Sequence, residues 1–177
     1  MSNAAIYFVD SNVAEGRGDS VAFREAGSGG GLTYGALARK SGQVAGALTA
    51  IGMRREERLA LLVLDQIEFP ALFWGALKAG VVPVPLNTLL APPVYAAILR
   101  DSRARVLVVS EPLWDLVAPV LPKVPHVETV IVIGNAQDGA MRYADFMAGG
   151  DPIASPFDAS DDDVAFWLYS SGSTGAP

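Results

Sequence analysis

The sequence predicts an α/β fold in which a largely parallel sheet is flanked by helices. Short apolar runs of strand length, such as Arg58–Leu64 and Arg105–Val109, are typical of strands that are buried on both faces. Between these runs lie segments in which apolar residues recur at helical spacing and which glycine or proline bounds. Strands that alternate with helices favour parallel pairing through right-handed crossovers.

The first elements are a strand and a capped helix. A strand is predicted at Val21–Glu25, and the glycine-rich turn Gly27–Gly31 after it is either a hairpin tip or a mobile loop. Thr33 has the side chain of a helix N-cap, and the apolar spacing after it predicts a helix through Ile51. Gly52 is the expected C-terminal stop.

The later elements continue the alternation. A strand at 58–64 leads into a helix at 68–79, with Pro70 in its first turn and Gly80 at its end. Ser110 is predicted to cap a helix that runs to about Leu121, with Pro112 in its first turn. The other predicted elements are strand 81–85, helix 93–101, strand 105–109, strand 129–133, helix 143–148, loop 151–163 and strand 164–169.

Composition and charge restrict the function. Hydrophobic residues make up 51% of the 177 residues, which indicates either a well-filled core or apolar surface that covers something outside this segment. Lysine plus arginine (13) minus aspartate plus glutamate (19) gives a net charge of −6, so a nucleic-acid partner is not expected. Without cysteine there is no disulfide framework or thiolate metal site, and a cytoplasmic location is expected.

The sequence contains neither a secretory signal nor a convincing membrane-spanning helix. Met1–Asp10 lacks the basic and apolar regions of a secretory signal. Residues 79–99 carry no charge and are long enough to span a bilayer, but they contain four prolines. Each proline inside a helix costs about 3 kcal/mol, so a buried strand, a loop and a helix are predicted there instead.

A serine- and glycine-rich segment closes the sequence, directly after the predicted buried strand Val164–Tyr169. Glycines permit a tight turn with exposed backbone N–H groups that bind anions, and hydroxyl side chains add further donors. The expected ligands are the β- and γ-phosphates of a nucleotide. The candidate binding residues are Ser170, Ser171, Gly172, Ser173, Thr174 and Gly175.

Other interpretations of this segment are weaker. The P-loop of NTPases needs a glycine, four residues and then Gly-Lys-Ser/Thr, but no lysine follows either glycine here. A linker that binds nothing is the second alternative. A linker rarely follows a buried strand such as Phe166–Tyr169 directly, so a phosphate-binding loop is favoured.

The segment from Tyr169 to Pro177 resembles the phosphate-binding motif of the adenylate-forming superfamily, which includes acyl- and aryl-CoA synthetases, luciferases and peptide-synthetase adenylation domains. Every position present here matches, and the Lys-Gly that ends the motif in the family would follow Pro177. Leu32-Thr33-Tyr34 resembles a second family stretch, although Ala36 replaces its glutamate. The capping box is therefore half missing, and this helix end is expected to fray.

Further stretches extend the resemblance to about residue 4. Leu77–Gly80 followed by Val84–Asn87 is similar to the family's second core motif. Three parts of the chain resemble benzoate- and 4-hydroxybenzoate-CoA ligases in particular. They are the start (Asn3–Ala5, Tyr7-Phe8 and Asn12–Asp19), Pro85–Leu90 and Ala165–Gly175. The family pocket for the acid is built mostly from later segments, so these residues do not identify the acid.

The resemblance implies an ATP-dependent aryl-CoA ligase that uses ATP, Mg²⁺ and coenzyme A in the breakdown of aromatic compounds. It implies that residues 1–177 are part of the large N-terminal AMP-binding domain, cut within the phosphate-binding loop at 169–177. The catalytic lysine and the ribose-binding aspartate lie beyond Pro177, so no catalytic residue is expected here and the fragment alone is expected to be inactive. The expected partners are an aryl carboxylic acid and the rest of the parent chain, with a homodimer left open.

Other candidate residues have plainer explanations. His126 lacks clustered ligands for a metal site, and Asp161-Asp162-Asp163 is expected to be a solvated loop rather than a cation site. The aromatic side chains Phe73, Trp74 and Trp167 are predicted to be core. No metal ligand is therefore assigned. Asn87 and Thr88 follow a strand and are weak candidates for lining a substrate cleft.

Three other functions remain open from the sequence alone. These alternatives are a fragment of a fatty acyl-CoA ligase, a non-catalytic binding module and an unrelated phosphate-binding α/β domain. A coding sequence that continues with Lys-Gly and the later family motifs would indicate an enzyme. A stop codon after Pro177 would favour the binding module.

Overall fold

The computed structural model describes residues 3–27, 29–135, 137–153 and 155–170. Its centre is a five-stranded sheet of order β4-β3-β5-β6-β7, in which every neighbouring pair is parallel. The predicted α/β fold with a parallel sheet is therefore confirmed. The strands are β3 (Arg58–Leu62), β4 (Val82–Pro85), β5 (Val106–Ser110), β6 (Thr129–Ile133) and β7 (Met141–Arg142).

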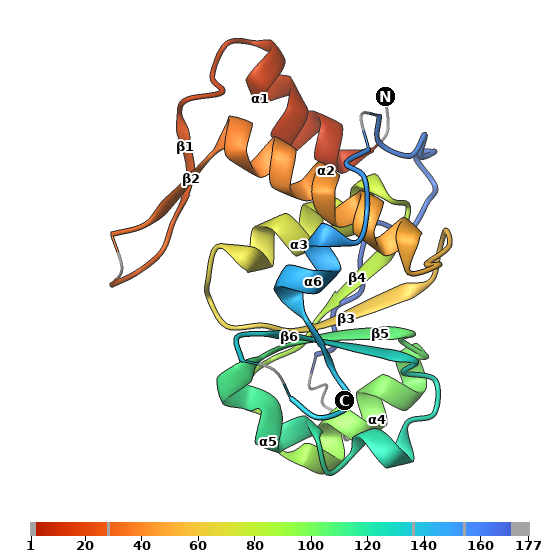
Figure 1. Ribbon diagram of the computed structural model, residues 1–177. Helices are drawn as coiled ribbons and strands as arrows, with labels where there is room; N and C mark the ends of the chain where they lie inside the picture. Colours follow the sequence, from red (N-terminus) through yellow and green to blue (C-terminus); the bar gives the residue numbers. More distant parts are fainter. Residues whose placement is uncertain (1–2, 28, 136, 154, 171–177) are drawn as a thin grey trace.

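Helices cover both faces of this sheet (Figure 1). On one face lie α2 (Tyr34–Ala50), α3 (Glu68–Lys78) and α6 (Tyr143–Ala148), and on the other lie α4 (Pro92–Ser102) and α5 (Trp114–Val117). Successive residues of β3 therefore enter different cores. Leu59 and Leu61 belong to the cluster under α2 and α3, whereas Ala60 and Leu62 belong to the cluster under α4. This burial on both faces explains why the strand is an unbroken apolar run.

A small hairpin stands apart from the sheet. It consists of β1 (Val21–Arg24) and β2 (Gly31–Thr33), which pair antiparallel and project from the body in Figure 1. The glycine-rich turn thus forms a hairpin tip. Two short helical stretches precede it, a π-helix at Ile6–Asp10 and α1 (Ser11–Ala14). Sequence patterns missed this helical stretch because no side chain caps either piece.

Both ends of α2 and the end of α3 follow the predicted signals. Thr33 Oγ1 accepts a hydrogen bond from the backbone N–H of Ala36 at 3.2 Å, which is the half of the capping box that the sequence retains. Gly52 and Gly80, which follow α2 and α3, have φ angles of 80° and 71°. This left-handed conformation is the reason for glycine at both positions.

The predicted helix 111–121 is wrong in extent. A 3₁₀ turn at Glu111–Leu113 leads into α5, which ends at Val117. Pro119 lacks the N–H that would continue the helix. Ser110 does not cap it either, because its hydroxyl accepts from Leu64 N at 3.0 Å and donates to Gln66 Oε1 at 3.3 Å.

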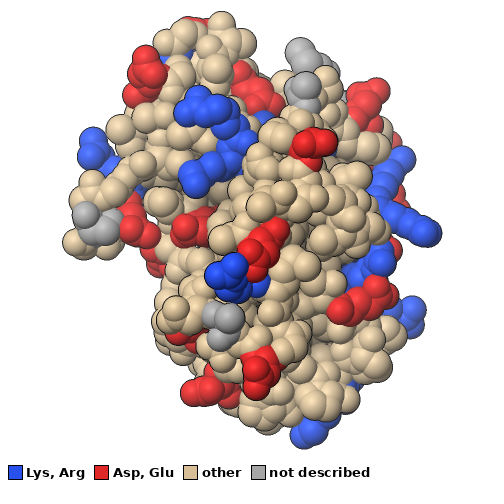
Figure 2. Space-filling model, in the orientation of Figure 1, with Lys and Arg blue, Asp and Glu red and all other residues tan. Residues whose placement is uncertain are grey.

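The high apolar content is divided between the core and the surface. The two clusters against the sheet are well filled, with many side chains fully buried. Large apolar side chains are also exposed, among them Tyr7 (71%), Leu89 (90%) and Leu168 (67%). Basic and acidic side chains are mixed over the face that Figure 2 shows, with broad uncharged areas between them.

Acid is expected to destabilise the fold by protonating Glu57, which is hydrogen-bonded to Arg54 and Arg105. Burial acts to raise the pKa of Glu57, but hydrogen bonds from Arg54 N (2.8 Å) and Arg105 Nη1 (2.9 Å) lower it overall below its ordinary 4.5. A lowered folded-state pKa means that the unfolded chain binds more protons as the pH falls below about 4.5, so stability is lost in that range. We expect urea midpoints to fall between about pH 5 and pH 3, less steeply for Glu57→Gln. Equal slopes for both proteins would contradict this role of Glu57.

Candidate functional site

Residues 157–170, the edge segment, lead into the predicted phosphate-binding loop and lie along the outer edge of β4. Phe157 N donates to Lys78 O at 2.7 Å, and ten residues later Trp167 N donates to Pro83 O at 3.1 Å. The order of these contacts shows that the chain advances in the same direction as β4. Ser170 therefore leaves toward the carboxyl ends of the parallel strands, the side on which open α/β sheets bind ligands.

This segment is not a strand, which corrects the prediction for residues 164–169. Prolines in β4 give the physical reason. The N–H of Val82 and of Leu86 point to the β3 side, where they donate to Glu57 O and Leu61 O. By alternation the nitrogens of Pro83 and Pro85 face outward, and proline nitrogen has no proton to donate. The outer edge of β4 therefore offers carbonyl acceptors but not the donors that a ladder needs.

Side chains of the segment nevertheless alternate as those of a strand do. Phe166 stacks edge-on with Phe73 of α3, with ring centroids 5.5 Å apart. Tyr169 packs on the opposite cluster, under α4. The segment thus lies over the edge of both cores without being buried. The predictions that Phe166–Tyr169 is a buried strand and that Trp167 is core are wrong, since Phe166 is 45% and Trp167 is 36% exposed.

Two long-range contacts hold the end of the segment. Tyr169 donates its hydroxyl to Asp101 Oδ2, the carboxylate near the end of α4, at 2.6 Å. Burial, and then the hydrogen bond and negative charge of Asp101, raise the pKa of Tyr169 to about 12, so the donor keeps its proton at neutral pH. The guanidinium of Arg58 lies over the Trp167 ring, 5.5 Å from its centroid.

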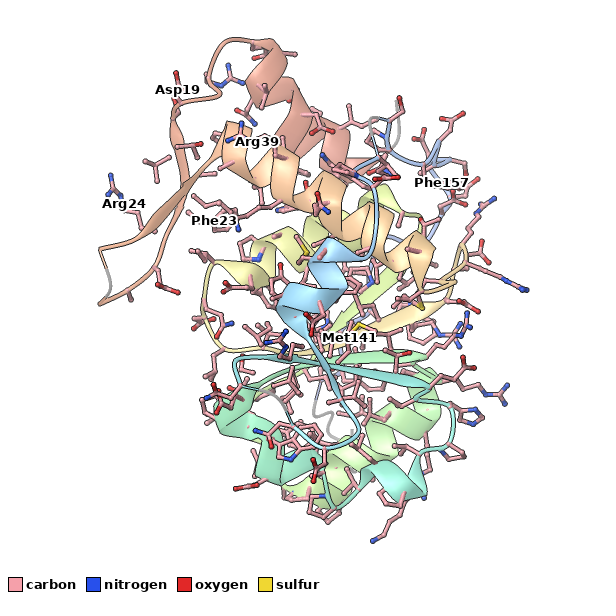
Figure 3. All side chains as sticks on the ribbon, viewed as in Figure 1. Asp19, Phe23, Arg24, Arg39, Met141 and Phe157 are labelled. Carbon is pink, nitrogen blue, oxygen red and sulfur yellow. The ribbon has the colours of Figure 1, made fainter. Side chains whose placement is uncertain are left out.

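The start of the segment is tied down by the N-terminal residues. Asn3 is buried, and its amide nitrogen donates to Leu77 O at 2.8 Å and to Phe157 O at 3.0 Å. The Phe157 ring, labelled in Figure 3, lies under the Arg55 guanidinium at 4.8 Å. Arg55 also pairs with Asp163 at 2.6 Å. Contacts from three parts of the chain thus fix the path that leads to Ser170.

The structure places only one of the predicted phosphate-binding residues. Ser170 is exposed and follows Tyr169 directly. The other five predicted residues lie outside the described part of the chain, and they are Ser171, Gly172, Ser173, Thr174 and Gly175. The ligand-binding prediction for the loop therefore stays a prediction.

Most secondary candidates have local roles. Asn87 Oδ1 accepts from Leu89 N at 2.9 Å, so this side chain shapes its own loop. Asp163 accepts from Ser160 N at 2.9 Å and lies in the loop predicted for it. Phe73 and Trp74 pack against core clusters but are only partly buried. Among the described residues, no group of three or more His, Cys, Asp or Glu side chains is arranged to hold a metal ion.

Sequence patterns missed the contacts that hold the segment before Ser170. Tyr169 and Asp101 are 68 residues apart, and Arg58 and Trp167 are farther still. No spacing rule links such pairs, because only the fold brings them together. The single signal is Asp101 itself, since a carboxylate in the last turn of a helix is unfavourable next to the helix dipole.

No helix in the described residues is both long and apolar enough to cross a membrane. The uncharged stretch 79–99 instead contains β4, the loop after it and most of α4. The sequence-based exclusion of a single spanning helix there is therefore confirmed.

Comparison with known proteins identifies relatives of the whole chain. A family model described as AMP-binding enzyme matches residues 10–177. The chain is 41% identical to the 4-hydroxybenzoate–CoA/benzoate–CoA ligase of Rhodopseudomonas palustris and 42% identical to the benzoate–CoA ligase of Thauera aromatica. Each alignment covers 99% of this chain but only 32% and 33% of the relative. The chain thus spans about a third of the length of these relatives.

A solved structure agrees with the fold. The anthranilate CoA ligase AuaEII, in complex with anthranoyl-AMP, superposes with a TM-score of 0.91 at 32% identity. The match covers 98% of this chain and 33% of that one. The superposition therefore includes the edge segment beside β4 as well as the five-stranded sheet.

Proposed function

Because the chain belongs to the AMP-binding enzyme family, we propose that it is the amino-terminal part of an ATP-dependent aryl-CoA ligase. The observation that carries this proposal is the position of Ser170. It follows an anchored segment that runs toward the carboxyl ends of a parallel sheet, and in the sequence Ser-Gly-Ser-Thr-Gly comes directly after it. The relatives named as benzoate-CoA ligases support an aryl acid as the substrate.

The proposed role of the loop is to hold the phosphates of ATP. The substrate carboxylate attacks the α-phosphorus, and the bond from this phosphorus to the oxygen that bridges to the β-phosphate breaks. Pyrophosphate departs, and an acyl-adenylate remains. Backbone N–H groups and hydroxyls of residues 170–175 would bind the departing pyrophosphate, where fixed donors stabilise the charge that develops. The Mg²⁺ that accompanies ATP would neutralise part of the phosphate charge.

The second step forms the thioester. The sulfur of coenzyme A attacks the acyl carbon, the bond to the AMP oxygen breaks, and the thiol proton passes to solvent. None of the described residues is assigned to this step. Residues 1–177 would supply the phosphate-binding residues 170–175 and part of the large N-terminal domain, and the parent enzyme would work in the cytoplasm in the degradation of aromatic acids.

A ligation assay tests the proposal. We expect the full-length parent to release AMP from ATP and coenzyme A with benzoate or 4-hydroxybenzoate. We expect residues 1–177 alone to release none, because the later catalytic segments are missing. Three loop hydrogen bonds of about 1.5–3 kcal/mol each also leave only about millimolar affinity for ATP once association costs of at least about 4 kcal/mol are met.

Different outcomes reject different parts of the proposal. AMP release with fatty acids but not with aryl acids would keep the reaction and reject the aryl substrate. Acyl-adenylate made by residues 1–177 would reject the inactivity of the fragment. A parent that releases no AMP with any acid would favour a non-catalytic binding module.

A further inference from the structure

We infer that Tyr169 and Asp101 form a positioning pair for the phosphate-binding loop, an inference that rests on the proposed function. Tyr169 is the last residue before Ser170, so its side chain fixes the point at which the loop begins. Its hydroxyl donates to Asp101 Oδ2 at 2.6 Å, and Asp101 belongs to α4, which packs against the sheet. The pair therefore joins the loop to α4 at the place where backbone hydrogen bonds no longer hold the chain.

The edge of β4 explains why a side-chain anchor is needed. Among the described residues, Trp167 N to Pro83 O is the one backbone hydrogen bond between residues 164–170 and β4. Outward-facing proline nitrogens prevent a regular ladder beyond it. After Trp167, the chain is held through side chains, with the Tyr169 ring on the α4 cluster and its hydroxyl on Asp101.

The chemistry of Asp101 supports a specific role. A carboxylate in the last turn of a helix is repelled by the negative end of the helix dipole. Asp101 is exposed, and Tyr169 is the one hydrogen-bond partner of its carboxylate among the described residues. Asp101 is thus unfavourable for the stability of α4. Its bond to Tyr169, the residue before the loop, gives a better reason for a carboxylate at this position.

Loop position matters for catalysis because phosphoryl-type transfer depends on geometry. Donors stabilise the developing charge only when they lie at hydrogen-bond distance from it, and a misplacement of about 1 Å can cost about a hundredfold in rate. The same donors would hold the phosphates of bound ATP, so losing one anchor at the base of the loop is expected to weaken ATP binding selectively and to raise KM for ATP. The acid and coenzyme A do not contact this loop in the proposed mechanism.

The test is steady-state kinetics of the full-length parent. We expect Tyr169→Phe, which keeps the ring, to raise KM for ATP about tenfold, which corresponds to about 1.4 kcal/mol. KM for the acid and for coenzyme A should stay within about twofold, or about 0.4 kcal/mol. Asp101→Ala should match Tyr169→Phe, and the double variant should be no worse than either single one. Asp101→Asn, which keeps an acceptor oxygen, should recover most of the loss.

Tyr7→Phe is the matched control, since it removes a hydroxyl from a tyrosine that is 71% exposed. It should leave all three KM values unchanged. Unchanged KM for ATP in Tyr169→Phe, or equal rises of all three KM values together with a lower melting temperature, would overturn the positioning role. A wild-type parent without activity would instead overturn the proposed function, and this inference with it.

Discussion

Replacing Gly75 with alanine is expected to lower the free energy of unfolding by about 3 kcal/mol. Gly75 lies in α3 where that helix crosses α2. A Cβ atom there would lie 2.5 Å from Val44 Cβ and Cγ1 and 2.8 Å from Ser41 O. Two of these atoms are a Cβ and a backbone oxygen, which cannot move without shifting α2. In most helices the same change stabilises by about 1 kcal/mol, so the expected sign is itself diagnostic.

Thermal unfolding of the wild type and two variants measures this effect. For a chain of this size, about 3 kcal/mol corresponds to a fall in Tm of about 6–12 °C. Gly18→Ala is the control, because its nearest neighbour, Val13 Cγ1, would be 3.8 Å from the new Cβ. A Gly75→Ala protein as stable as the wild type would show that α2 and α3 do not pack this closely.

Close packing of this kind could not be predicted from the sequence, although the elements themselves could. The strands at 58–62 and 106–110 and the helix at 34–50 were predicted within a few residues, because continuous apolar runs and a Thr–Gly pair of end signals are local. Gly75 carries no such signal. It reads as an unfavourable residue inside a helix, and only the crossing with Val44 explains it.

The edge segment shows the opposite failure, in which a local pattern was misleading. Phe166 and Trp167 have the composition of a buried strand, yet both are more than a third exposed. Hydrophobicity alone does not tell whether the neighbouring strand offers donors. The relevant residues, Pro83 and Pro85, lie some 80 positions earlier and matter only once β4 is adjacent.

The sequence predicted the residue types of the candidate site but not the long-range contacts that hold the segment before it. Ser170 was predicted from its motif and was expected to follow a buried strand, whereas in the structure it follows an exposed segment that is not a strand. Its anchor on Asp101 depends on a helix and a segment 68 residues apart. A side chain whose local placement is unfavourable, as for a carboxylate at the end of α4, is the kind of signal that can indicate such a contact in advance.

A second large effect is expected at the ion pair between Asp10 and Lys78. Lys78 Nζ lies 2.6 Å from Asp10 Oδ1 and 3.3 Å from Ala38 O, so the pair joins the N-terminal helical stretch, α2 and α3. The two partners differ in their access to water. The Lys78 side chain is 5% exposed, whereas that of Asp10 is 29% exposed.

This asymmetry predicts unequal losses. Asp10→Ala leaves a buried ammonium without its counter-charge and is expected to cost about 3 kcal/mol, the low end for a broken buried pair. Lys78→Met removes the buried charge and keeps the apolar stem, and the remaining carboxylate can be hydrated, so about 1 kcal/mol is expected. The double variant should resemble Lys78→Met, because without the ammonium the loss of Asp10 leaves no charge unpaired.

Urea unfolding of the three variants at neutral pH decides the matter, with Asp145→Ala as the control. Asp145 pairs with Arg142 at 2.7 Å, but both side chains are more than half exposed and solvent screens their charges, so little change in the urea midpoint is expected. Equal losses for Asp10→Ala and Lys78→Met, or a double variant that loses their sum, would refute the asymmetric burial of the pair. Losses in the predicted order would show that Asp10 stabilises the fold chiefly by neutralising Lys78. This ion pair holds the N-terminal residues against α2 and α3, and the edge segment begins at Phe157, which is hydrogen-bonded to the Lys78 carbonyl.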